Sequence, residues 1–159
     1  MKSLILYYSK NNTTKETVEK ISRNKDVDVC DLRKLDNVRI SDYENIYIGS
    51  GIYMGSLPGT VKKHIKKISK SLEGKNIIYF VHGIISQKNY KEIINNSIGE
   101  YLSNSNTRYL YLGGRLDVSK QNFIIKKMLK QIAKQNNLNP NYVDTRNKTC
   151  IEGLINDIK

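Results

Sequence analysis

The order of apolar runs constrains this chain more than any other feature of its sequence. Short runs rich in Ile, Val and Tyr alternate with longer stretches in which apolar residues recur every three or four positions. Strands are predicted at residues 4–8, 27–30, 46–49, 77–82 and 109–112, and helices at about 14–23, 58–72, 90–102, 120–136 and 151–158. This alternation is typical of a parallel sheet with helices on both faces. We therefore expect an α/β fold, a doubly wound parallel sheet of five strands, in a single domain spanning residues 1–159.

The helix predicted at 120–136 is an insertion, because the helix at 151–158 already completes a five-stranded α/β sandwich. Its apolar residues cover about half of the helical wheel: Ile124, Ile125, Met128, Leu129, Ile132 and Ala133. Lysines occupy the opposite side, where Phe123 is the only apolar residue. We place the helical insertion at about 117–146 and interpret its polar end, 137–146, as a surface connection.

The net charge of +12 is concentrated in two of the predicted helices. Residues 59–75 carry six Lys against one Glu, and residues 119–137 carry five Lys and no acidic residue. A solvated lysine face over a buried apolar stripe explains both segments. The alternative is a docking surface for an anionic partner, such as peripheral contact with a membrane through the lysines of the insertion: Lys120, Lys126, Lys127, Lys130 and Lys134. Nucleic acid is not expected as a partner, because no nucleic-acid-binding motif appears.

Cysteine and histidine are too sparse for a metal centre. Cys30 and Cys150 lie far apart in the sequence, and His64 and His82 cannot complete a usual zinc ligand set. We expect neither a metal nor a disulfide. The apolar run at 4–8 is too short for a signal peptide, and no stretch approaches the ~20 residues of a membrane span. A cytoplasmic location is expected, with peripheral membrane contact as the alternative.

The loops beyond the carboxyl ends of the strands form the candidate site, because ligands of open α/β sheets bind there. The first of these loops reads Ser9-Lys10-Asn11-Asn12-Thr13-Thr14. Its hydroxyls and backbone amides at the start of a helix suit a phosphate group. The loop matches neither GxxxxGK[ST] nor GxGxxG. The plain alternative is a turn in which Thr13 and Glu16 form a capping box.

This loop resembles the phosphate loop of flavodoxins, roughly [ST]-x-[TS]-G-x-T, with Ser9 and Thr14 at the terminal hydroxyl positions. The resemblance implies the strand order 2-1-3-4-5 and FMN as the cofactor. It also implies that the phosphate is held by Ser9, Lys10, Asn11, Asn12, Thr13 and Thr14. Asn12 stands where the family usually has glycine, and Asn tolerates a left-handed backbone better than other non-glycine residues.

The loop after the third strand, IGSGIYMG at residues 48–55, suits a flat ligand. Its glycines allow close backbone approach, and Tyr53 and Met54 offer surfaces for stacking on a ring. In the flavodoxin superfamily this loop holds the isoalloxazine ring, which implies contacts from Ser50, Gly51, Ile52, Tyr53, Met54 and Gly55. The segment also resembles the quinone-dependent, flavodoxin-like type of protoporphyrinogen oxidase, as do the basic insertion and the segment 144–146.

Two further loops complete the expected edge. The loop after the fourth strand is expected to flank the flavin through His82, Gly83, Ile84 and Tyr90. His82 is interpreted as a hydrogen-bonding residue at a strand end, with a catalytic role as the alternative, and Tyr90 either stacks on the flavin or packs elsewhere. In the last loop Arg115 either binds a substrate carboxylate or pairs with Asp117. No catalytic side chain is predicted, because the flavin carries the redox chemistry.

Three functions follow from these observations. The resemblance favours an FMN-dependent oxidoreductase of the protoporphyrinogen oxidase type in heme biosynthesis, with a porphyrinogen substrate and a quinone acceptor. The second is a flavodoxin that carries electrons between redox proteins. The third is a flavin-free binding module, in which Asn12 abolishes cofactor binding and the basic helices dock on a membrane or an acidic partner.

Overall fold

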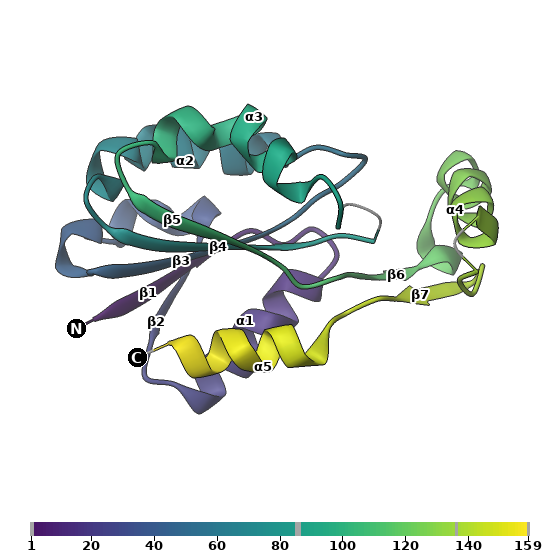
Figure 1. Cartoon of the computed structure of the whole chain (residues 1–159), viewed down its shortest axis with the longest axis horizontal. Coiled ribbons are helices and arrows are strands. Elements are labelled where there is room, and N and C mark those ends of the chain that lie inside the picture. The colour runs from purple at the N-terminus through teal and green to yellow at the C-terminus, as the bar shows by residue number, and fades with distance from the viewer. Residues whose placement is uncertain (1, 85–86, 136, 159) are drawn as a thin grey trace.

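A parallel sheet of five strands forms the centre of the protein (Figure 1). The computed structural model describes residues 2–84, 87–135 and 137–158. The strands are β1 (Ser3–Tyr7), β2 (Asp28–Asp31), β3 (Asn45–Gly51), β4 (Asn76–His82) and β5 (Asn106–Tyr111). They lie in the order β2-β1-β3-β4-β5, which confirms both the predicted fold class and the predicted strand order.

Helices cover both faces of this sheet (Figure 1). On one face lie α1 (Thr13–Asn24) and α5 (Lys148–Asp157), and on the other lie α2 (Gly59–Leu72) and α3 (Tyr90–Leu102). Successive strand residues point to opposite faces, so each strand supplies both cores. Ile5 of β1 packs with the α1 and α5 side, whereas its neighbours Leu4 and Leu6 pack with the α2 and α3 side.

The basic helix α2 is an ordinary sheet-covering helix. Its apolar residues fall on one helical face and are fully or almost fully buried: Val61, Ile65, Ile68 and Leu72. The lysines between them point away from this buried stripe. Residues between β2 and β3 add two short 3-10 helices, Leu32–Asn37 and Ile40–Asp42.

The insertion after the last strand of the sheet folds as an arm. β6 (Arg115–Asp117) and β7 (Tyr142–Asp144) pair antiparallel in a separate two-stranded sheet. Between them lie a 3-10 turn, Val118–Lys120, and the helix α4 (Phe123–Gln135), which sits at the far end of the arm (Figure 1). The helical insertion is thus present, and the connection at 137–146 is mostly exposed, as expected, but it also contains the strand β7, which pairs with β6.

No helix among residues 2–84, 87–135 and 137–158 is long and apolar enough to cross a membrane.

Candidate functional site

The first loop leads into α1 through Asn12, which has a left-handed backbone conformation. Asn12 has φ 61° and ψ −12°, a conformation that costs most L residues free energy and that Asn adopts more readily. Thr13 and Thr14 follow as buried residues of the first turn of α1. The hydroxyl oxygen of Ser9 is buried and has no hydrogen-bond partner among the described residues. The loop therefore contains an unused hydroxyl and leads into the amino end of a helix.

The capping box expected in this loop is wrong. Asn12 occupies the N-cap position and makes no side-chain capping bond, while Thr13 lies inside the helix. Glu16 instead forms ion pairs with two arginines of the arm, Arg115 and, at 3.3 Å, Arg146. Arg146 also holds Asp144 through two side-chain hydrogen bonds of 2.9 and 2.6 Å, and these bonds lower the pKa of that carboxyl group. The first turn of α1 is thereby fastened to the base of the arm.

The end of β3 has two glycines that have no room for a side chain. A Cβ atom on Gly49 would overlap the Phe80 ring, and one on Gly51 would lie 2.6 Å from the Tyr53 ring. Tyr53 folds back over Gly51, and its hydroxyl accepts a 3.1 Å hydrogen bond from the backbone N–H of Lys10. Met54 is exposed and has a left-handed backbone, with φ 52°. The second loop therefore touches the first through Tyr53.

His82, at the end of β4, is fully engaged inside the protein. Its Nδ1–H donates to the Gly113 carbonyl over 2.7 Å, since a carbonyl can only accept, and the Thr17 hydroxyl then donates to Nε2 over 3.0 Å. Burial lowers the pKa of His82 to about 4, so the ring is neutral at pH 7. This geometry agrees with a hydrogen-bonding residue at a strand end and leaves neither ring nitrogen available to a substrate.

The three loops and the last strand end meet around one small cavity of about 60 Å³. It brings together most of the residues predicted from the sequence: Asn11, Thr13, Thr14, Gly51, Ile52, Tyr53, His82, Gly83, Ile84 and Arg115. Gly114 lines it as well and was not predicted. The order of the strands places these segments together, because the carboxyl ends of β1, β3, β4 and β5 share one edge of the sheet.

Other predicted residues lie outside the lining of this cavity. Ser9, Lys10, Asn12, Met54 and Gly55 belong to its two loops without lining it. Ser50 is fully buried, and its hydroxyl shares a 2.8 Å hydrogen bond with Tyr79. Tyr90 packs against Tyr111 at a ring distance of 5.5 Å and lines a different groove. Arg115 pairs with Glu16, so its predicted pairing with Asp117 is wrong.

The residue pattern and the sheet-edge geometry agree with a comparison against known families. Residues 4–142 match the model of a flavodoxin domain. The chain belongs to the flavodoxin family. The small cavity lies at the carboxyl ends of the strands, where ligands of open α/β sheets bind. A search of curated proteins gives no match.

Solved structures share this flavodoxin fold. The flavoprotein of Lactobacillus acidophilus NCFM in complex with FMN is 20% identical, covers 69% of this chain and 91% of its own, and has a TM-score of 0.55. The two-electron reduced flavodoxin of Megasphaera elsdenii is 12% identical, covers 70% of this chain and 85% of its own, and has a TM-score of 0.57. A flavodoxin from the domain Archaea is 21% identical, with 71% and 83% coverage and a TM-score of 0.54. At these identities the likeness shows the fold.

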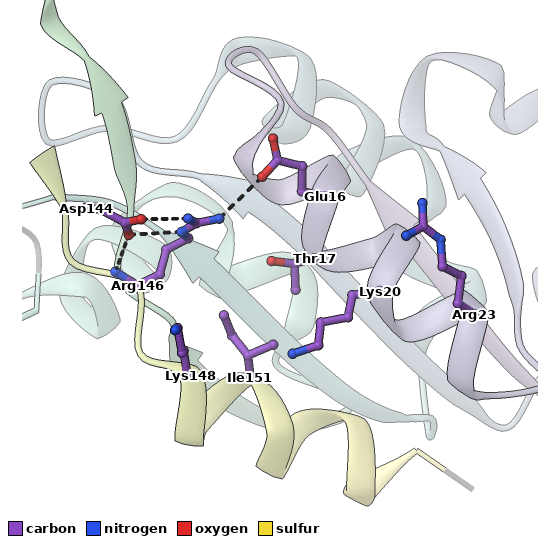
Figure 2. A pocket seen from close by; sticks show the side chains of 8 residues that line it. All are labelled: Glu16, Thr17, Lys20, Arg23, Asp144, Arg146, Lys148 and Ile151. Carbon is purple, nitrogen blue, oxygen red and sulfur yellow. Dashed lines mark hydrogen bonds and ion pairs between the residues drawn. The ribbon is translucent and has the colours of Figure 1, made fainter. Parts of the chain in front are cut away.

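A second, wider groove of about 630 Å³ lies between α1 and the stretch from β7 to the start of α5 (Figure 2). It is lined by Glu16, Thr17, Lys20, Arg23, Asp144, Arg146, Lys148 and Ile151. Figure 2 shows Arg146 reaching across to Glu16 while Lys20 extends toward Ile151. None of the predicted cofactor residues lines this groove. The sequence pattern indicates only capping for Glu16 and no role for Arg146, because their contact spans 130 positions and leaves no local pattern.

Proposed function

We propose that this chain binds FMN and acts as a redox protein of the flavodoxin family. The observation that carries the proposal is the first loop, where the Ser9 hydroxyl is buried without a partner among the described residues and the left-handed residue Asn12 leads into α1. A phosphate accepts hydrogen bonds from hydroxyls and from backbone N–H groups at a helix N-terminus. Ser9, Thr13, Thr14 and the loop amides would therefore hold the FMN phosphate.

The ring position needs one side chain to move. Cofactor pockets usually measure ~300–1,000 Å³, whereas the cavity here is about 60 Å³ and has Tyr53 in its lining. Rotation of Tyr53 away from Gly51 and Lys10 would open a flat slot bordered by Gly51, Ile52 and Ile84. The neutral His82 would stay behind this slot and fix the end of β4. Bound FMN supplies the chemistry, which is the transfer of one or two electrons, and the protein binds and orients it.

The visible absorption spectrum after incubation with FMN and desalting tests this proposal. We expect the protein to retain flavin bands. Replacing Ser9 by Ala is expected to weaken FMN binding about 10-fold or more, because one hydrogen bond to a charged group is lost. Stability without FMN should not change, since the hydroxyl has no protein partner. Ser69→Ala, on the solvent side of α2, is the control. A colourless wild-type protein would instead favour the flavin-free binding module.

We further propose, as the finer assignment, a protoporphyrinogen oxidase type of activity with a quinone acceptor. Its support is the segment IGSGIYMG at 48–55 together with the basic arm, which would suit a substrate bearing carboxylates. The test is oxidation of protoporphyrinogen by the FMN-loaded protein and reoxidation of the reduced protein by a quinone analogue. If neither step proceeds, this finer assignment fails while FMN binding stands.

The second candidate is a one-electron carrier between redox proteins. It is favoured by Met54, which is 72% exposed beside Tyr53 and offers a contact surface at the sheet edge. Because the net charge is +12, a carrier of this kind would dock on an acidic partner. Reduction by a flavodoxin reductase at a rate that falls steeply with salt would select the carrier over the oxidase.

A further inference from the structure

The helix at the end of the arm carries the two most exposed large apolar side chains of the described residues. Phe123 is 81% exposed and Ile124 is 77% exposed, and they are adjacent in the first turn of α4. Figure 1 shows α4 held away from the sheet, beyond the edge where the arm leaves it. Two adjacent exposed apolar side chains on a protruding helix indicate a binding surface, because contact with water does not favour them.

The opposite side of α4 is partly buried, and α4 contacts the 3-10 turn Val118–Lys120 of the arm. Ala133 is buried, and a partly buried set lies near it: Ile125, Met128, Leu129 and Ile132. Beyond the end of α4, the backbone N–H of Leu138 donates a 2.8 Å hydrogen bond to the Ala133 carbonyl. Five of the six residues of the apolar half-wheel are therefore partly or fully buried, whereas Ile124 at its rim is exposed and Phe123 lies outside it.

The outward side combines the aromatic ring with lysines. At ~100° per residue, Lys127, Lys130 and Lys134 all fall within about 40° of Phe123 on the helical wheel. Residues 119–137 contain no Asp or Glu. The acid closest in sequence, Asp117, accepts bonds from Ser119 and pairs with Lys120. Within the described part of the chain, no salt bridge involves these three lysines.

We propose that this face of α4 docks on an anionic lipid bilayer. Phe123 and Ile124 enter the headgroup region, and Lys127, Lys130 and Lys134 lie against the anionic surface. An interfacial helix needs this combination of apolar anchors and cations. Each lysine near such a surface strengthens binding about 5-fold. A second copy of the chain is a poorer occupant, because its own lysines would meet these like charges.

The base of the arm orients the docked protein. Glu16, in the first turn of α1, pairs with Arg115, where the chain enters the arm, and with Arg146, where the chain leaves it. The arm leaves the sheet at the same edge as the cavity between the loops, so docking through α4 places that cavity on the membrane side of the molecule (Figure 1). This proposal does not depend on FMN, since no residue of the docking face lines the cavity.

Sedimentation of the full chain with vesicles tests the proposal. The vesicles are pure phosphatidylcholine, or phosphatidylcholine with about 30% phosphatidylglycerol, at about 0.1 M and about 0.5 M salt. We expect binding to the anionic vesicles only, and loss of binding at the higher salt. Lys127→Gln with Lys130→Gln should weaken binding about 30-fold. Phe123→Ser should weaken it about 10-fold or more.

The matched control changes the same charge on the other basic helix. Lys63 and Lys70 are exposed on α2, which has no exposed large apolar residue, and Lys63→Gln with Lys70→Gln should leave binding unchanged. Circular dichroism of each variant verifies that it is folded. Wild-type protein left in the supernatant with anionic vesicles would overturn the proposal, as would equal losses in the two double variants. Unchanged vesicle binding of Phe123→Ser would overturn it too. So would wild-type protein that binds no vesicles but forms a dimer in sedimentation velocity, if Phe123→Ser abolishes that dimer.

Discussion

Asn12 takes the backbone conformation that the flavodoxin loop pattern assigns to glycine. Its φ of 61° lies in the left-handed region, where Asn pays a smaller steric penalty than other L residues. The departure from the family pattern at this position therefore leaves the turn in place.

Substitutions at Asn12 should separate the needs of the turn from those of the side chain. Asn12→Gly should leave the free energy of unfolding unchanged within about 0.5 kcal/mol, and Asn12→Val should lower it by about 1–2 kcal/mol, because a β-branched residue resists φ above zero. FMN retention should follow the same order. Urea unfolding measures the first effect and desalting after FMN incubation the second. A stable Val variant would show that the turn tolerates a different backbone.

His82 gives the stability of the protein a pH dependence. The unfolded chain protonates this ring near pH 6.5, whereas in the folded protein its pKa is about 4. Protons therefore favour the unfolded chain as the pH falls, and the free energy of unfolding should drop by about 2 kcal/mol between pH 7 and pH 5. Urea unfolding at the two pH values measures this difference. In His82→Gln, which cannot titrate, the difference should largely disappear. An unchanged slope in that variant would assign the effect to another group.

At the scale of elements, the regular units and the helix of the insertion were predictable, whereas the pairing of β6 with β7 was not. The buried runs and the helical stripe of α2 specify their own structure, so the five strands and their order follow from sequence and resemblance. β6 and β7 have only three residues each, which is too short for a visible alternation. The Glu16 contacts with Arg115 and Arg146 depend on that pairing. Tyr90 does not line the predicted site, because it lies in α3 and its ring packs on Tyr111.

The ring of Phe80 packs so closely on β3 that position 49 has room only for glycine. A Cβ atom here would overlap the buried Phe80 ring and lie 3.1 Å from Thr14, so Gly49→Ala should lower the free energy of unfolding by about 1–3 kcal/mol. Gly59→Ala is the matched control, because no atom lies within 4 Å of its added Cβ. Its stability should be equal to or slightly above that of the wild type. Equal urea midpoints for the two variants would mean that the Phe80 ring moves freely.

At the scale of the whole molecule, the net charge of +12 opposes compaction. Repulsion between like charges is screened as the Debye length falls from ~30 Å at 0.01 M salt to ~8 Å at 0.15 M. The thermal midpoint should therefore rise over this range by about 2–4 °C, equivalent to about 1 kcal/mol for a chain of this size. Calorimetry in sodium chloride measures it. A falling midpoint would show that the surface ion pairs outweigh the repulsion.

The parallel sheet places its ligand loops at one edge of the molecule, and this polarity has a practical use. β1 begins and α5 ends at the edge opposite the loops and the arm (Figure 1). A fluorescent fusion or an immobilisation tag at either terminus would leave the loop edge and α4 unobstructed. On a conducting support, such a tether would turn the flavodoxin loops outward toward solution. A tag placed within the arm would have the opposite orientation, and the two attachments would compare electron exchange through the two ends of one molecule.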